Sequence, residues 1–188
     1  MLFLAKQHQM PIKLHLGCGN VSIPNYMNVD VRNTDAADLK QDIQTLPSFE
    51  AGTVDLIYAS HVLEHFGRRK YKQALSRWFE LLRSGATLRI AVPDMEAVMK
   101  YYLETKNLEA VRGFLWGGQT YPENTHYCGW DFDKMKEDLQ NIGFTNVRRY
   151  DWRLTEHSNL DDYSQSYLPH MDKENGALMS LNVEATKP

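Results

Sequence analysis

Lys13-Leu-His-Leu-Gly-Cys-Gly-Asn20 and, shortly after it, Met27-Asn-Val-Asp30 carry the strongest structural signal in this chain. The first apolar run ends in a Gly-x-Gly turn at Gly17 and Gly19, and the second ends in an acid, Asp30. Glycines let a chain turn sharply and let its backbone approach a ligand, because no Cβ stands in the way. A carboxylate at the end of the next strand can accept hydrogen bonds from two ribose hydroxyls. The two stretches together predict a nucleoside-binding crevice in an open α/β sheet.

The spacing of these residues counts against a dinucleotide site. A dinucleotide fingerprint has a third glycine three residues after the second one and an acid about 20 residues further on. Ser22 stands in the place of that glycine, and Asp30 comes much sooner. The segment 21–27 contains Pro24 and can hold one helical turn at most, although parallel strands usually need a longer crossover. An extended segment of this length still spans roughly 25 Å, so a parallel return without a helix is feasible.

The composition is that of one globular domain. Hydrophobic residues make up 43% of the 188 positions, which is enough for a sizeable core. The net charge of −3 provides no strong basic field, and the longest apolar runs are strand-sized, so we expect no nucleic-acid partner and no membrane insertion. Cys18 and Cys128 are expected to be free thiols in a reducing cytoplasm. Residues 1–11 are expected to form a flexible leader, and 12–188 a single domain.

Strand and helix signals alternate along the chain. Strands are predicted at 12–16, 27–30, 54–59, 87–92, 146–152 and 179–186, with a weaker one at 38–43. Helices are predicted at 68–83, 107–115 and 132–142, and a further helix follows Asp94, which is a favourable N-cap residue. Ser60 is expected near the cap of a short helix, and Gly85 at the C′ position after 68–83. The alternation predicts a three-layer α/β domain with the last two strands at the edge of the sheet.

Five short motifs give this chain a family resemblance. They are LHLGCGN at 14–20, NVD at 28–30, the acid–apolar pair at 42–43, SHVLEH at 60–65 and the L-R-x-G turn within 81–85. In this order and spacing they resemble class I S-adenosylmethionine-dependent methyltransferases, in particular a compact bacterial group that tolerates the short first crossover. The resemblance runs from about residue 12 to the end of the chain. It implies a Rossmann-like fold with a mostly parallel seven-stranded sheet, an antiparallel last strand, and S-adenosylmethionine as cofactor.

The resemblance also implies how the cofactor is bound. The backbone of the turn Gly17-Cys18-Gly19 would face the methionyl end, and Asp30 would hold the ribose hydroxyls. Asp42 would accept a hydrogen bond from the adenine amino group, and Ile43 would pack against the ring. The alternatives are an ordinary strand-to-helix turn and solvated acids at the ends of strands.

Position 15 departs from the pattern of many relatives. They carry an acid two residues before the first glycine, and that acid steadies the methionyl amino group. His15 stands there in this chain. Another acceptor must therefore take over, and the backbone carbonyl of Ala59 or Ser60 is the candidate.

The segment His61-Val-Leu-Glu64-His65 has three interpretations. H-x-x-E-H is also the signature of inverted zinc proteases, with two histidine ligands and Glu64 as base. The segment directly follows a buried strand within a methyltransferase series, so we disfavour that interpretation. A metal held by Glu64 and His65 to orient an acceptor is a second option. We expect instead that His61 and Glu64 line the methionyl pocket, that His61 or His65 faces the acceptor, and that no metal is needed.

The segment 116–130 mixes glycine, proline and aromatic residues and is the best candidate for acceptor binding. Its aromatic residues could form a wall or lid hinged at Gly117-Gly118, or could simply pack the domain; they are Trp116, Tyr121, Tyr127 and Trp130. His126 is a candidate general base, because an ordinary histidine pKa suits proton transfer at neutral pH. An exposed or structurally satisfied histidine is the alternative.

These observations favour transfer of a methyl group from S-adenosylmethionine to a small molecule, with a sugar or a surface-glycan precursor as the preferred acceptor. His126 and His65 are the candidate catalytic residues. Two other classes remain open at this point: a non-catalytic module that binds S-adenosylmethionine, and an NAD-dependent sugar-modifying enzyme. The methylated atom and the oligomeric state are left open.

Overall fold

A seven-stranded sheet forms the centre of the computed structural model, which describes residues 10–188; the expected leader falls almost entirely outside this range. The strands run in the order β3-β2-β1-β4-β5-β9-β6. Their bounds are β1 Lys13–Leu16, β2 Met27–Asp30, β3 Leu39–Lys40, β4 Val54–Ser60, β5 Leu82–Pro93, β6 Thr145–Arg149 and β9 Ser180–Thr186. β9 is antiparallel to β5 and β6, and the neighbours from β3 to β5 are parallel. The sheet confirms the predicted Rossmann-like fold, and the two strands predicted last, β6 and β9, lie together at one end of it, with β6 outermost.

The first crossover contains no helix. Residues 17–26 form turns and segments without regular secondary structure, yet β1 and β2 pair in parallel, with Leu14 opposite Met27 and Leu16 opposite Val29. An extended return is therefore long enough, as its length predicts.

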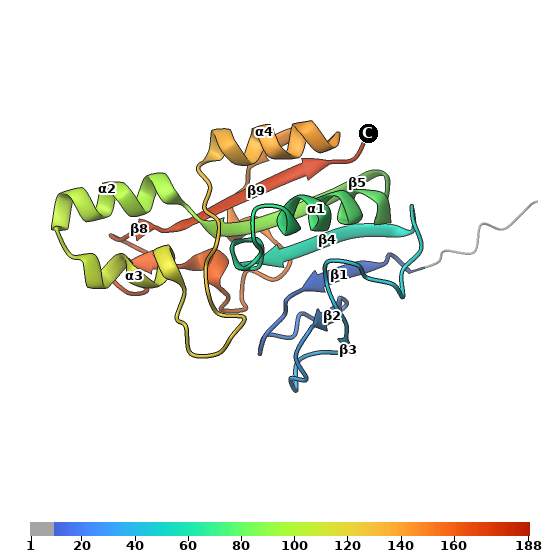
Figure 1. The fold of residues 1–188 in the computed structure, drawn as a ribbon, viewed down its shortest axis with the longest axis horizontal. Coiled ribbons are helices and arrows are strands. Elements are labelled where there is room, and N and C mark those ends of the chain that lie inside the picture. Colours follow the sequence, from blue (N-terminus) through green and yellow to red (C-terminus); the bar gives the residue numbers. More distant parts are fainter. Residues whose placement is uncertain (1–9) are drawn as a thin grey trace, which may run out of the picture.

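One face of the sheet is apolar and covered by helices. Figure 1 shows α1 (Lys70–Leu81) and α4 (Phe132–Ile142) together on this face. Leu16, Ile57 and Trp78 belong to the core between the layers, and each is fully buried. The helices α2 (Met95–Thr105) and α3 (Leu108–Trp116) extend beyond the end of the sheet, and Asp94 caps α2 as predicted by accepting from two backbone amides of its first turn.

The opposite face is polar. His15, Tyr58 and Arg89 are neighbours in register across β1, β4 and β5. The chain after β6 covers them: Arg89 pairs with Glu156 at 3.1 Å, and the Tyr58 hydroxyl donates to Asp162. This third layer contains the 3-10 helices η2 (Trp152–Leu154) and η3 (Tyr163–Gln165). The small hairpin of β7 (Tyr167–Leu168) and β8 (Ala177–Leu178) lies beside α2 and α3, where Leu168 shares a hydrophobic cluster with Val98 and Val111 (Figure 1).

Several predicted boundaries are wrong. α1 ends at Leu81, and buried Leu82 passes directly into β5, where it pairs with Val54. Gly85 therefore lies in β5, with φ +79°, and does not end a helix. Ser60 belongs to β4, and the 3-10 helix η1 (Leu63–His65) has no side-chain cap.

Among the strands, β3 and β6 fall furthest short of their predicted lengths, since they have two and five residues. Within residues 10–188, none of the helices has the length and apolar character that a membrane crossing requires.

Candidate active site

The glycine turn after β1 is packed closely against the end of β4. Gly17 and Gly19 have φ of +66° and +56°, a region that side chains disfavour. A Cβ on Gly17 would lie 2.4 Å from Val62 Cγ2, so no side chain fits there. The amides of Gly17 and Cys18 donate to the Val29 carbonyl at 2.8 and 3.2 Å. These two amides are thus used within the protein, and the missing side chain at Gly17 lets Val62 pack against the turn.

Cys18 is a free, buried thiol in this turn, and Cys128 is free as well. Burial, and then the negative charge of Asp30, raise the pKa of the Cys18 thiol to about 11. Cys18 is therefore an unreactive packing residue at neutral pH.

Asp30 joins the end of β2 to the glycine turn. Its Oδ2 accepts from the Gly19 amide at 2.8 Å, and its Oδ1 accepts from the Arg32 amide at 2.8 Å and from Arg32 Nε at 3.3 Å. The residue is 4% exposed. A carboxylate can accept about four hydrogen bonds, so acceptor capacity remains for a ligand. The turn and the acid therefore form one unit, as their spacing predicts.

The other residues predicted to bind the cofactor lie in different settings. Asp42 is exposed, and its Oδ1 accepts from the Gln44 amide at 2.8 Å. Ile43 is packed in the core, and its carbonyl accepts from Trp78 Nε1. His15 is buried on the polar face of the sheet, with its Nδ1 3.0 Å from Asn28 Oδ1. The Ser60 hydroxyl, at the end of β4, is buried and has no hydrogen-bond partner among the described residues.

Glu64 is a fully buried carboxylate in η1. Its Oε1 lies 3.2 Å from His61 Nδ1, and its Oε2 has no hydrogen-bond donor within residues 10–188. Burial alone would raise the pKa of this carboxyl, but interaction with the neighbouring His61 side chain outweighs burial and brings it below the usual value. Glu64 is therefore ionised at neutral pH.

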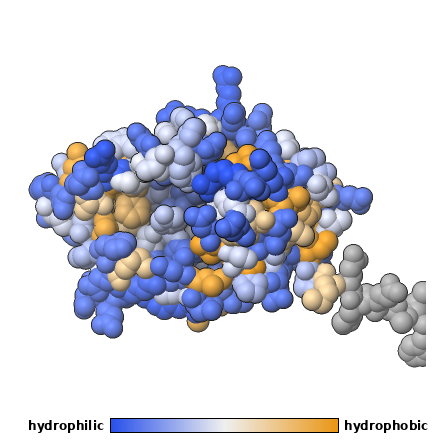
Figure 2. Space-filling view, turned by 90° about the horizontal axis from the view of Figure 1, so that it is seen from below, coloured by the Kyte–Doolittle hydropathy of each residue, from blue (hydrophilic) through white to orange (hydrophobic). Residues whose placement is uncertain are grey.

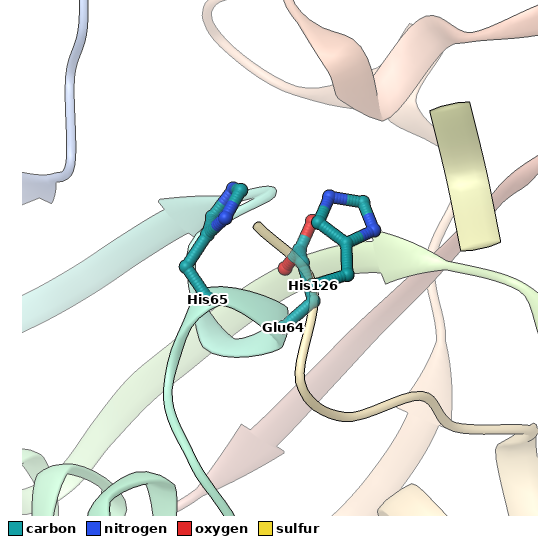
Figure 3. A group of neighbouring side chains, drawn as sticks. All are labelled: Glu64, His65 and His126. Atoms are coloured by element: carbon teal, nitrogen blue, oxygen red, sulfur yellow. The ribbon is translucent and has the colours of Figure 1, made fainter. Parts of the chain in front are cut away.

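His65 and His126 approach the same point from different parts of the chain. Their ring centroids are 4.8 Å apart. One ring nitrogen of each histidine and one carboxylate oxygen of Glu64 all lie within 4.8 Å of one another. Figure 3 shows the Glu64 carboxylate between the two rings. His65 Nδ1 is 3.2 Å from the Thr125 carbonyl, and His126 Nδ1 is 2.9 Å from the Phe114 carbonyl. Burial lowers the pKa of His126, so this imidazole is neutral at neutral pH.

His61 has a different role from that of His65. Its backbone adopts φ +52°, and its Nε2 lies 3.1 Å from Ser180 Oγ. The H-x-x-E-H segment is a sharp turn followed by a single 3-10 turn, not an α-helix that carries two histidines one turn apart. The geometry therefore agrees with our prediction against the zinc-protease interpretation.

The loop 117–129 connects the surroundings of Asp30 with those of Glu64. Its Tyr121 ring lies 4.6 Å from the guanidinium of Arg32, beside Asp30. Its other end is held by the Tyr127 and Cys128 amides, which donate to the Glu64 carbonyl at 2.7 and 3.3 Å.

The aromatic residues of this region divide into two groups. Trp116, Tyr121 and Tyr127 are 46%, 40% and 60% exposed. Trp130 is 2% exposed and donates to Asp138 Oδ2 at 3.0 Å, so it packs the domain and cannot belong to a wall or lid.

Comparisons with known proteins agree with this geometry. A family model described as a methyltransferase domain matches residues 13–149. A search of curated protein sequences finds no match. A SAM-dependent methyltransferase from Archaeoglobus fulgidus superimposes with a TM-score of 0.57 over 94% of this chain and 86% of its own, at 15% identity. A SAM-dependent methyltransferase from Methanosarcina mazei gives 0.57 over 95% and 93%, also at 15% identity.

A third structure is similar in fold and contains ligands. It is the 1,6-didemethyltoxoflavin-N1-methyltransferase of Burkholderia thailandensis with bound 1,6-didemethyltoxoflavin and S-adenosylhomocysteine, and it has a TM-score of 0.59 over 94% of this chain and 71% of its own, at 14% identity. At such identities the likeness shows the fold. The family match, which covers well over half of the chain, leaves no reason to retain an NAD-dependent enzyme or a non-catalytic module. The chain belongs to the methyltransferase-domain family and is an S-adenosylmethionine-dependent methyltransferase with the class I fold.

Proposed function

We propose that this methyltransferase acts on a hydroxyl oxygen of a polar small molecule, with a sugar or a surface-glycan precursor as the preferred acceptor. The observation that carries the proposal is the cluster of Glu64, His65 and His126. It begins two residues after Val62, which is in close contact with the glycine turn. A proton-accepting group therefore lies beside the crevice in which the cofactor is expected.

The residues around that crevice suit an adenosine-bearing sulfonium. Asp30 would accept from the ribose hydroxyls, and the methionyl part would lie against the turn at Gly19, where an added Cβ would meet only Arg32 Nη2, at 3.5 Å. The Ser60 hydroxyl, which has no partner within residues 10–188, and the carbonyls at the end of β4 would take over from the missing acid at position 15. We retain Asp42 for the adenine amino group, with neighbouring Ile43 as its apolar contact. When bound, S-adenosylmethionine supplies an electrophilic methyl group, and the main task left to the protein is to position the acceptor in line with it.

A hydroxyl acceptor also needs to lose its proton. His126 is neutral, and its Nδ1 donates to a carbonyl, so its Nε2 carries a lone pair that can accept a proton. The ionised Glu64 carboxylate nearby would stabilise the resulting imidazolium, as a buried acid does for a catalytic histidine. An amine acceptor in its neutral form can attack without a base and would depend less on this arrangement.

The surroundings of the cluster favour a polar acceptor. Figure 2 views the molecule from below, the side on which Figure 1 shows the loop 117–129 and the ends of β1 and β2, and the surface there is mainly hydrophilic with separate hydrophobic groups. The exposed rings of Trp116, Tyr121 and Tyr127 could stack on the apolar face of a sugar while its hydroxyls stay in polar surroundings.

The proposal is tested by a screen with methyl-labelled S-adenosylmethionine. The acceptors are nucleotide sugars, sugar phosphates and lipid-linked glycans, with aromatic amines and thiols as the contrasting set. We expect label in a sugar, on an oxygen by NMR of the product, and its loss in the His126→Gln variant. Label on nitrogen, carbon or sulfur would overturn the assignment of oxygen, and label in the contrasting set alone would overturn the assignment of a sugar.

A further inference from the structure

The cluster of Glu64, His65 and His126 has features that proton transfer alone does not explain. A base needs one imidazole, yet two converge here. Glu64 is fully buried, and its Oε2 lacks any hydrogen-bond donor within residues 10–188. A buried ionised carboxylate is costly unless it is paired or coordinates a metal ion. His61 Nδ1 lies 3.2 Å from Oε1, so it is Oε2, without a donor in the described part of the chain, that indicates a further, positively charged ligand.

The two histidines are held in the way that metal-binding histidines are held. Each Nδ1 faces a backbone carbonyl, Thr125 for His65 and Phe114 for His126. A carbonyl can only accept, so Nδ1 carries the hydrogen in both rings and each Nε2 presents a lone pair. Second-shell carbonyls of this kind orient imidazole ligands and fix their tautomer at metal sites. Nothing in a purely structural role requires both rings to be set in the same tautomer.

We propose that Glu64, His65 and His126 bind a divalent first-row transition-metal ion, with zinc as the reference ion. Two imidazoles and one carboxylate form the three-residue ligand set of open metal sites, which keep a position for substrate. Ligand atoms bound at about 2.1 Å in a tetrahedron are about 3.4 Å apart, so the side chains have to move together by on the order of an ångström from their present span. Magnesium is disfavoured, because it prefers oxygen ligands.

The inference rests on the proposed function and gives the cluster a more specific task. The open position would hold an acceptor hydroxyl and lower its pKa, so that its proton leaves to solvent. The transfer itself is unchanged: the oxygen–methyl bond forms while the sulfur–methyl bond breaks, and a neutral thioether remains. Because the ion would occupy the Nε2 lone pairs, His126 cannot both bind it and act as the base. The two roles therefore make different predictions.

The experiment uses the untagged full-length chain after removal of metal with a chelator. Zinc, cobalt and magnesium chlorides are titrated separately by calorimetry, and cobalt binding is also followed through its visible absorption. We expect one zinc or cobalt per chain, no magnesium, and an affinity at least about tenfold lower in Glu64→Gln and His126→Gln. The matched control is His170→Gln, because His170 is an exposed histidine far from η1 in sequence and should leave metal binding unchanged.

The outcomes separate this inference from the proposed function. A far-UV circular dichroism spectrum and a thermal transition like those of the wild type show that each variant is folded. Failure of the stripped chain to bind zinc or cobalt, or wild-type affinity in both cluster variants, would overturn the metal site. Full sugar O-methylation by metal-free enzyme would also overturn it while supporting the histidine base. Stoichiometric zinc with label on nitrogen would retain the metal site and reject the proposed oxygen acceptor.

Discussion

The two parts of the candidate site are built in different ways. In the nucleoside part, the glycine turn and Asp30 come from consecutive strands, and the bond that joins them spans 11 residues of sequence. In the acceptor part, the hydrogen bond between His65 Nδ1 and the Thr125 carbonyl of the loop 117–129 spans 60 residues of sequence, and His126 comes from the same loop. The first part rests on a short backbone connection, and the second depends on where a long chain segment is placed. The nucleoside part should therefore respond to backbone changes and the acceptor part to side-chain changes.

The largest expected effect is that of Gly17→Ala in the nucleoside part. The new Cβ would lie 2.4 Å from Val62 in a backbone with φ +66°, so overpacking and strain together should lower the free energy of unfolding by about 2–6 kcal/mol. Calorimetry should show loss of S-adenosylmethionine binding, and urea denaturation should show the loss of stability. Gly85→Ala is the matched control, since φ is +79° there but nothing lies within 4 Å of the added Cβ. Equal losses in the two variants would mean that the contact with Val62 is unimportant.

The second effect concerns His126→Gln in the acceptor part. Loss of a general base or of a metal ligand should lower turnover by roughly 10²–10⁴-fold, because the acceptor hydroxyl then keeps its proton. The affinity for S-adenosylmethionine should stay at the wild-type value, because His126 lies outside the nucleoside part. Single-turnover kinetics and calorimetry measure the two quantities separately. A loss of cofactor affinity that matches the loss of turnover would contradict the division of the site.

The third effect is that of Asp30→Asn. The substitution keeps the shape but removes the charge and one acceptor from a 4% exposed group, so cofactor binding should weaken by about 1–3 kcal/mol, or roughly 5- to 150-fold. Asp133→Asn, on the exposed surface of α4, is the control and should change binding by less than about 0.5 kcal/mol. Wild-type affinity in Asp30→Asn would remove Asp30 from the site.

The smallest effect is the pH dependence of stability. Burial lowers the pKa of His15, His126 and His157 below the ordinary value of 6.5. As pH falls through 6.5, the unfolded chain binds protons that the folded chain does not, so the free energy of unfolding should fall until the lower folded-state pKa values are reached. Urea denaturation at neutral pH and at pH below 6.5 measures this. His126→Gln should make the change in the free energy of unfolding with pH smaller, because the contribution of His126 is lost. His170→Gln should leave this change as it is in the wild type. Greater stability below pH 6.5 would contradict the burial of these histidines as neutral rings.

Much of the fold could be predicted because its signals are local. The strand ends at Gly17 and Asp30 and the cap at Asp94 depend on neighbours a few residues away. The errors have a common cause, which is competition from tertiary contacts. Gly85 is a good C′ residue, but burial of Leu82 against Val54 extends β5 towards α1. For Trp130, composition leaves both a wall or lid and packing of the domain open, and the hydrogen bond of its indole to Asp138 decides for packing.

The amino-acid sequence alone determined the nucleoside part, the alternation of strands and helices, and the family to which both point. Short-range spacing is enough for these, because the relevant residues are joined by a few peptide units. Only the tertiary structure decided that His126 meets Glu64 and His65, that both rings present Nε2, and that a buried carboxylate lies between them. These features depend on the loop 117–129 being bound to the Glu64 carbonyl, and no spacing along the chain specifies where a long segment returns.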